Sequence, residues 1–62
     1  MITGYEYELW YDGGCLHCEG GFDSEEEAYE DAEIERDYRA EIWDMDGVEY
    51  DLDYFEIIIN EI

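Results

Sequence analysis

Lysine and proline are absent from this 62-residue chain, and histidine, serine and threonine each occur once. The only cations are Arg36 and Arg39, which excludes the broad basic surface that holds nucleic acid or an anionic membrane by charge. No apolar run is long enough to span a membrane, and no basic segment followed by an apolar run indicates a signal peptide. We therefore expect a soluble cytoplasmic protein that binds neither nucleic acid nor a membrane directly.

Groups that could carry catalysis are equally scarce. Neither the single serine nor the two cysteines have a base and an orienting group in a local pattern. Acid/base catalysis by a carboxylate needs an apolar pocket that raises its pKa, and a chain of 62 residues has little volume for one. The sequence therefore predicts that the protein is not an enzyme and uses no cofactor.

Acidic residues dominate what is present, since 21 Asp and Glu give a formal net charge of −19. A globular chain of this mass exposes roughly 4,200 Å², which corresponds to one net negative charge per ~220 Å², about half the charge density of B-DNA. Folding does not require this charge, because self-repulsion destabilises a compact state. We favour a binding role that depends on the charge, and adaptation for solubility or for high salt is the alternative.

The remaining composition and pattern predict a folded α+β protein. Hydrophobic residues make up 47% of the chain, and no Pro-rich or Ser-rich linker divides it, so residues 1–62 are expected to form a single acidic domain. Residues 5–12 alternate in polarity like a strand, Gly13-Gly14 offers a hairpin turn, and residues 15–19 can return as a second strand. Residues 55–59 are apolar and β-branched, as in a central strand.

A helix is expected between the second and the last of these strands. Ser24 followed by Glu27 forms a capping box, and Glu25, Glu26 and Glu27 suit the positive end of the helix dipole. The expected fold is β-β-α-β, a small antiparallel sheet of three strands with one helix packed across it. The periodicity does not decide whether residues 48–50 add a fourth strand. The side of the helix expected to face the sheet carries Ala28, Tyr29, Ala32, Arg36, Arg39, Ala40 and Trp43.

A second apolar row on this helix, Ile34, Tyr38 and Ile42, leaves its role open. The row could pack under a loop or the last strand, residues after Asp37 could instead form a strand, or the row could be an exposed contact for a partner or a second copy. Arg36 and Arg39 are expected to bury their stems against the sheet and to pair with Glu6, Glu8 or Glu56 on the strands.

Cys15-Leu16-His17-Cys18 is the one segment whose residues could bind a metal or carry redox chemistry. It offers three ligands where a structural zinc site needs four, although Glu19 or a second copy could supply another. A redox C-x-x-C motif normally begins a helix, whereas these cysteines lie in an expected strand, and three residues apart they would point to opposite faces of a regular strand. Structural thiols, a metal site and a redox pair all stay open, in that order of preference.

The acidic segment that begins at Asp44 does not fit a calcium loop. Gly47 stands at position 4 counted from Asp44, whereas the EF-hand loop needs glycine at position 6. Weak divalent binding to the clustered carboxylates remains an alternative.

In its lack of lysine, its capping Ser24 before three glutamates, its acidic helix and its aromatic strands, the chain resembles small acidic bacteriophage proteins of the anti-CRISPR and anti-restriction DNA-mimic type. The resemblance is one of composition and layout along the whole chain. It implies an inhibitor that acts in the host cytoplasm, as a monomer or homodimer. The inhibitor would occupy the positively charged DNA-binding surface of a host defence protein or ribonucleoprotein, a CRISPR-Cas effector being favoured, and block target DNA.

Ten carboxylates are the expected partner-binding residues, because those on the helix recur at a spacing close to that of DNA phosphates. They are Glu27, Glu30, Glu33, Asp37, Glu41, Asp44, Asp46, Glu49, Asp51 and Asp53. The alternative function is a small metal-binding or dimeric interaction module that uses Cys15, His17 and Cys18, with Ile34, Tyr38 and Ile42 as the contact.

Overall fold

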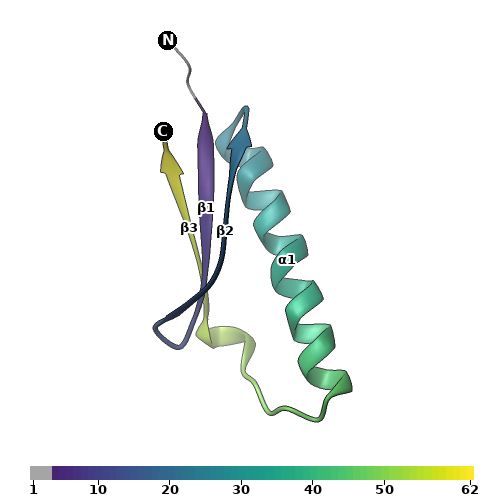
Figure 1. The fold of residues 1–62 in the computed structure, drawn as a ribbon. Coiled ribbons are helices and arrows are strands. Elements are labelled where there is room, and N and C mark those ends of the chain that lie inside the picture. The colour runs from purple at the N-terminus through teal and green to yellow at the C-terminus, as the bar shows by residue number, and fades with distance from the viewer. Residues whose placement is uncertain (1–3) are drawn as a thin grey trace.

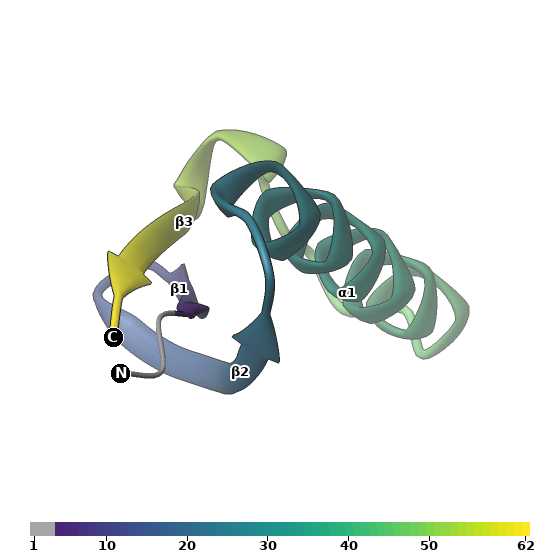
Figure 2. The same cartoon turned by 90° about the horizontal axis from the view of Figure 1, so that it is seen from above.

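The computed structural model describes residues 4–62, which form a three-stranded antiparallel sheet and one long helix. The elements follow in the order β1 (Tyr5–Tyr11), β2 (Gly14–Phe22), α1 (Glu25–Met45), a short 3-10 helix η1 (Leu52–Tyr54) and β3 (Phe55–Glu61). Figures 1 and 2 show α1 lying along one side of the sheet. The expected β-β-α-β fold is confirmed, and residues 48–50 do not add a fourth strand.

The hairpin turn lies one residue earlier than the Gly13-Gly14 pair predicted. Asp12 and Gly13 both have positive φ, 47° and 83°, the pattern of the tight turn whose twist suits a hairpin. Gly14 already belongs to β2 and pairs with Tyr11. The second strand also continues beyond Glu19 to Phe22, with irregular pairing between Leu9 and Trp10 and again between Tyr5 and Glu6.

The central strand is β1, not the apolar strand β3, because the sheet order is β2-β1-β3. Pairing on both sides, together with the helix above one face, removes Tyr7 and Leu9 of β1 completely from solvent. These two residues form the core with Ala32 of α1. The partly buried side chains packed against this core are Leu16, Phe22, Phe55, Ile57 and Ile59.

The start of α1 is the one predicted from the capping box. The backbone N–H of Glu27 donates to Oγ of Ser24 at 3.1 Å, and the Glu27 carboxylate accepts from the N–H of Asp23 at 3.3 Å. Three glutamates in the first turn then lie at the positive end of the helix dipole. Local sequence alone therefore defines where this helix begins.

The helix continues to Met45, so the alternative of a strand after Asp37 is wrong. It ends where Gly47 adopts φ of 75° and the N–H of Val48 donates to the carbonyl of Trp43 at 2.8 Å. The N–H of Gly47 also donates to the carbonyl of Asp44 at 3.3 Å, which completes the usual glycine stop signal. The predicted Asp46-Gly47 turn is this helix end.

The sheet-facing side of α1 is lined by Ala28, Ala32 and Ala40, which are buried as predicted. Tyr29 was expected on the same side but is 44% exposed, so the prediction for this residue is wrong. Near the helix C-terminus, Trp43 stacks on Phe55 at 5.5 Å and meets Tyr11 edge-on at 4.9 Å. This aromatic cluster anchors the far end of the helix to β1 and β3.

Within residues 4–62, no helix has the length and apolar character needed to cross a bilayer.

Candidate protein-binding surface

Five predicted carboxylates lie on the side of α1 that faces away from the sheet, and all five are exposed. This acidic row consists of Glu27, Glu30, Asp37, Glu41 and Asp44. Glu33, which was predicted with them, is only half-exposed, because it lies towards the edge of the buried alanine side. The helix therefore gathers most but not all of the predicted carboxylates on one surface.

A row of apolar side chains runs beside the acidic row. Ile34, Tyr38 and Ile42 are 68%, 58% and 37% exposed, and Met45 one turn further on is 79% exposed. The interpretation that places these residues under a loop or the last strand is therefore wrong. Sequence reasoning missed Met45, although its position three residues after Ile42 continues the helical spacing. We call Ile34, Tyr38, Ile42 and Met45 the apolar row.

The remaining predicted carboxylates follow the helix in the link to β3. Asp46, Glu49, Asp51 and Asp53 are all exposed. Asp44, Glu49 and Asp51 line a shallow depression of about 720 Å³ together with Val48, Tyr50 and Leu52. Asp51 also has a structural part, because its Oδ1 accepts from the N–H of Asp53 at 2.9 Å and its own N–H donates to the hydroxyl of Tyr11 at 2.9 Å.

The charge density of this surface can be compared with that of DNA. Spread over 4568 Å², the net charge of −19 is one negative charge per about 240 Å². Along α1, Glu27 to Asp44 covers roughly 26 Å, so the five carboxylates of the acidic row have a mean axial spacing of about 6.4 Å, compared with 3.4 Å per phosphate along one DNA strand. The acidic row therefore has about half the linear charge density of one DNA strand.

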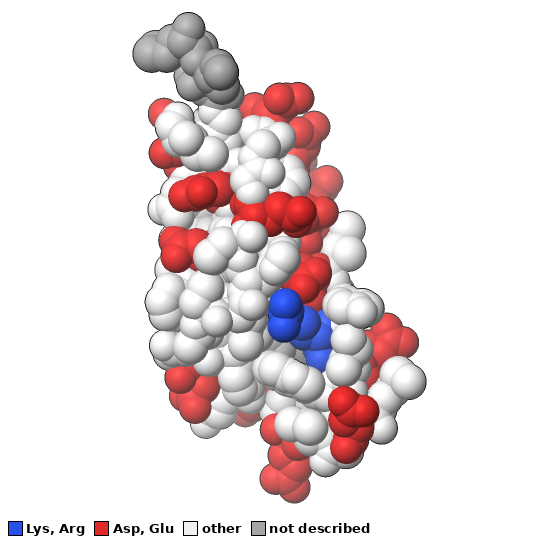
Figure 3. Space-filling view, viewed as in Figure 1, with Lys and Arg blue, Asp and Glu red and all other residues white. Residues whose placement is uncertain are grey.

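The two arginines lie where α1 meets the sheet, as predicted, but their partners are on the helix itself. Nε of Arg39 contacts Oε1 of Glu35 at 2.9 Å, and Arg36 contacts Oδ1 of Asp37 at 3.2 Å. The predicted ion pairs of the arginines with Glu6, Glu8 or Glu56 do not form. Strand alternation places these glutamates on the sheet face opposite to Tyr7 and Leu9, which α1 does not cover. In Figure 3 the arginines form one blue patch near the middle of the visible face, with acidic atoms next to the patch and in a band across the face above it.

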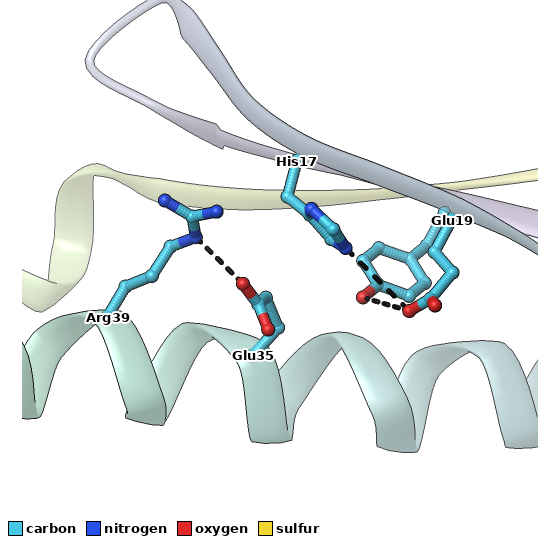
Figure 4. A network of polar contacts seen from close by, with 5 residues as sticks. His17, Glu19, Glu35 and Arg39 are labelled. Atoms are coloured by element: carbon cyan, nitrogen blue, oxygen red, sulfur yellow. Dashed lines mark hydrogen bonds and ion pairs between the residues drawn. The ribbon is translucent and has the colours of Figure 1, made fainter.

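Polar side chains fill part of the interface between β2 and the helix (Figure 4). The hydroxyl of Tyr7 donates to Oε2 of Glu19 at 3.2 Å, and Nε2 of His17 lies 3.7 Å from the same oxygen. Burial raises the pKa of Tyr7 well above its ordinary value of 10.0, and contacts with Asp31 and Glu19 raise it further. The acidic character of the chain thus reaches into the edge of its core.

The cysteines and His17 do not converge on one point. His17 pairs with Leu9 and its ring lies 5.9 Å from that of Tyr7, on the sheet face that α1 covers. Cys15 and Cys18 pair with Trp10 and Glu8 on the opposite face, where their Sγ atoms are 3.5 Å apart. The expectation that the two cysteines point to opposite faces is wrong, because one extra residue interrupts the alternation of β2.

This separation bears on whether these three residues, the candidate metal ligands, could act together. Cys15, His17 and Cys18 of one copy cannot bind a single ion, because the sheet lies between the thiols and the imidazole. Within residues 4–62, no group of three or more His, Cys, Asp or Glu side chains is arranged to hold a metal.

No protein-family model, curated protein or solved structure matches the chain.

Proposed function

We propose that this protein is a DNA-mimic inhibitor, which binds the positively charged DNA-binding surface of a host defence complex and excludes target DNA. A CRISPR-Cas effector is the favoured complex, and the cytoplasm of the host cell is where the two would meet. The observation that carries the proposal is the acidic row, which offers five exposed carboxylates on one side of α1. Of the two cations, Arg39 pairs with Glu35 outside the row and Arg36 pairs with Asp37 at 3.2 Å, so within residues 4–62 the other four carboxylates of the row have no arginine partner.

Competition with DNA follows from the physics of phosphate recognition. A DNA-binding channel gains much of its affinity from Lys and Arg side chains that meet phosphates and release counterions. Carboxylates fixed along a capped helix meet the same cations without the ordering entropy that a flexible acidic tail loses on binding. The net charge of −19 would also accelerate encounter with a basic protein, and it repels nucleic acid and anionic lipid.

The apolar row supplies the contact that distinguishes a specific partner from any basic surface. Charge alone attracts every nucleic-acid-binding protein, whereas apolar anchors at the centre of an interface give it shape and affinity. A second copy of the chain is a poor occupant, because it would bring another −19 charge against the same surface. We therefore assign the apolar row to the same basic partner as the acidic row.

The test asks whether this protein prevents a purified CRISPR-Cas effector ribonucleoprotein from binding DNA. Binding is measured by electrophoretic mobility shift with labelled target DNA. Added protein should displace the DNA, and inhibition should weaken steeply between about 50 and 200 mM salt because the contacts are ionic. Glu30→Lys combined with Glu41→Lys should abolish inhibition. Ile34→Ala combined with Tyr38→Ala should weaken inhibition while leaving its salt dependence unchanged.

The matched control is Glu56→Lys combined with Glu61→Lys, which changes the net charge equally at two exposed positions of β3. This control should inhibit nearly as well as the parent protein. If both charge-reversed variants lost the same amount of inhibition, net charge alone would explain the effect, and the assignment of the binding surface to α1 would be contradicted. Failure to displace DNA at low salt would contradict the proposed inhibition of this effector class.

The exposed apolar row also keeps the alternative function, a dimeric interaction module, open to experiment. Native mass spectrometry of the parent protein and of Tyr38→Ala separates the two proposals. A monomer that inhibits DNA binding supports the DNA mimic. A dimer that Tyr38→Ala dissociates, without inhibition of DNA binding, supports the interaction module.

A further inference from the structure

The extra residue in β2 brings Cys15 and Cys18 to the same place. Cys18 pairs with Glu8 and His17 with Leu9, but the next pair is Cys15 with Trp10, so Leu16 has no partner of its own. Since Glu8 and Trp10 are two residues apart on β1, both cysteines share the face that α1 leaves uncovered. Leu16 packs against the core from the other side.

The resulting pair of thiols is accessible and close to bonding distance. The two Sγ atoms are 3.5 Å apart, and both cysteines are free and exposed. A disulfide bond is about 2.05 Å long, so the sulfurs need to approach by roughly 1.5 Å to form one. The bulge therefore holds two exposed thiols in contact with each other, within roughly 1.5 Å of bonding distance.

The surroundings of the dithiol are negative. The contact with Cys15, a small loss of solvation and the charges of Cys15, Glu8 and Glu6 together raise the pKa of the Cys18 thiol. Glu6 and Glu8 both lie on β1, next to β2, on the same face as the thiols. An anionic reagent approaching this face meets these carboxylates and the −19 charge of the whole chain, whereas a cationic reagent is attracted by both.

We propose that Cys15 and Cys18 form a dithiol/disulfide exchange site that reacts preferentially with small cationic disulfides. One thiol loses its proton, and its sulfur attacks the reagent disulfide, which forms a mixed disulfide and releases one reagent thiol. The second cysteine then attacks the protein sulfur of the mixed disulfide and releases the other reagent thiol. The protein loses two electrons and two protons, and the reagent disulfide is reduced to two thiols.

The preference can be measured with three reagents of different charge. Reduced protein is mixed at low salt with cystamine, which is cationic, with hydroxyethyl disulfide, which is neutral, and with oxidised glutathione, which is anionic. Loss of free thiols gives the rate, and each rate is divided by the rate of the same reagent with dithiothreitol, an uncharged dithiol, to remove leaving-group differences. The normalised rate with cystamine should exceed that with oxidised glutathione by at least about tenfold.

Two further comparisons locate the origin of the preference. Salt at about 0.5 M should reduce the difference between reagents, because exposed charges are screened. Glu6→Gln combined with Glu8→Gln should reduce it more than Glu30→Gln combined with Glu41→Gln, which removes the same charge from the far side of the molecule. Equal effects of the two pairs would show that net charge alone selects the reagent and would overturn the local part of the assignment.

The products decide whether the two cysteines act together. Mass spectrometry of the parent protein should show loss of two hydrogens and no retained reagent, whereas Cys15→Ser and Cys18→Ser should each stop at a mixed disulfide. Two retained reagent molecules on the parent protein, or equal normalised rates for all three reagents, would overturn the proposal. The double variant Cys15→Ser/Cys18→Ser should still compete with DNA, so the outcome is independent of the proposed inhibitor function.

Discussion

The two sides of α1 differ in every property that decides what a helix surface does. The side towards the sheet carries small side chains, Ala28, Ala32 and Ala40, which are at most 7% exposed, and ends in Trp43 within an aromatic cluster. The side towards solvent carries the acidic row and the apolar row, in which Ile34 and Met45 are 68% and 79% exposed. Apolar residues occur on both sides, but only those towards the sheet are buried by the protein itself.

This difference shows that hydrophobicity alone does not identify the core of a small domain. Alanines let the helix backbone approach the sheet closely, so that Tyr7 and Leu9 are covered completely. Larger residues such as Ile34 and Tyr38 would not fit at that distance, and they lie on the other side. Stability should therefore depend on the small side of α1 and on the strand beneath it, whereas partner binding should depend on the large, exposed side.

The strongest test of the comparison is a matched pair of truncations. Leu9→Ala removes a fully buried side chain and should cost about 2–5 kcal/mol, enough to unfold much of a domain of this size. Ile34→Ala removes a similar volume from a side chain that is 68% exposed and should change the free energy of unfolding by less than about 0.5 kcal/mol. Urea denaturation followed by circular dichroism measures both, and similar losses would contradict the division of α1 into two sides.

A smaller loss of stability is expected when Tyr7 is replaced, because its hydroxyl contacts a carboxylate at the edge of the core. Replacement by Phe removes the hydrogen bond to Glu19 and should cost roughly 1–2 kcal/mol near pH 7. Because the pKa of Tyr7 is raised above 10.0 in the folded state, the unfolded chain loses this proton first as pH rises. The stabilisation is therefore complete below about pH 10 and is lost at higher pH.

The control for this alkaline loss is the same variant. Tyr7→Phe should lose less stability than the parent protein between about pH 10 and 11.5, because it lacks the titrating hydroxyl. Urea denaturation at a series of pH values gives the two curves. If the stability of the two proteins fell in parallel above pH 10, the raised pKa of the buried Tyr7 hydroxyl would be contradicted.

The smallest effect is expected for the arginines. Arg39→Ala removes an i, i+4 ion pair with Glu35 and part of a packed stem, and should lower the free energy of unfolding by about 0.5 kcal/mol, or the melting temperature by about 2–4 °C. Inhibition of DNA binding should not change, since Arg39 lies on the sheet side of α1. A fully stable Arg39→Ala variant that no longer inhibits would move Arg39 to the binding surface.

Local signals in the sequence account for much of the fold. The capping box at Ser24 and Glu27 predicted the helix start, and the alternation of residues 5–12 predicted β1, because both depend on neighbours within a few positions. The turn was predicted one residue late, since Asp12 as well as Gly13 adopts positive φ. Sheet order was not predictable from polarity, because the apolar strand β3 lies at an edge and the polar-faced β1 lies at the centre.

The candidate surface was predictable in outline and not in detail. Helical spacing identified most of the acidic row, but only the packed structure distinguishes exposed Asp37 from half-exposed Glu33. The same spacing found Ile34, Tyr38 and Ile42 without showing whether anything covers them. The predicted pairing of the arginines with glutamates of the strands was wrong. It depended on which face of the sheet lies under the helix, and the sequence does not show this.

The sequence by itself determined the −19 charge, the order of the three strands and the helix, and the start of the helix, because composition, alternation and capping can be read without knowledge of long-range contacts. Tertiary structure decided which apolar row is buried, because one helix can cover only one face of a three-stranded sheet. It also decided that Cys15 and Cys18 lie together while His17 lies apart, because a single unpaired residue in β2 changes the face of every side chain beyond it.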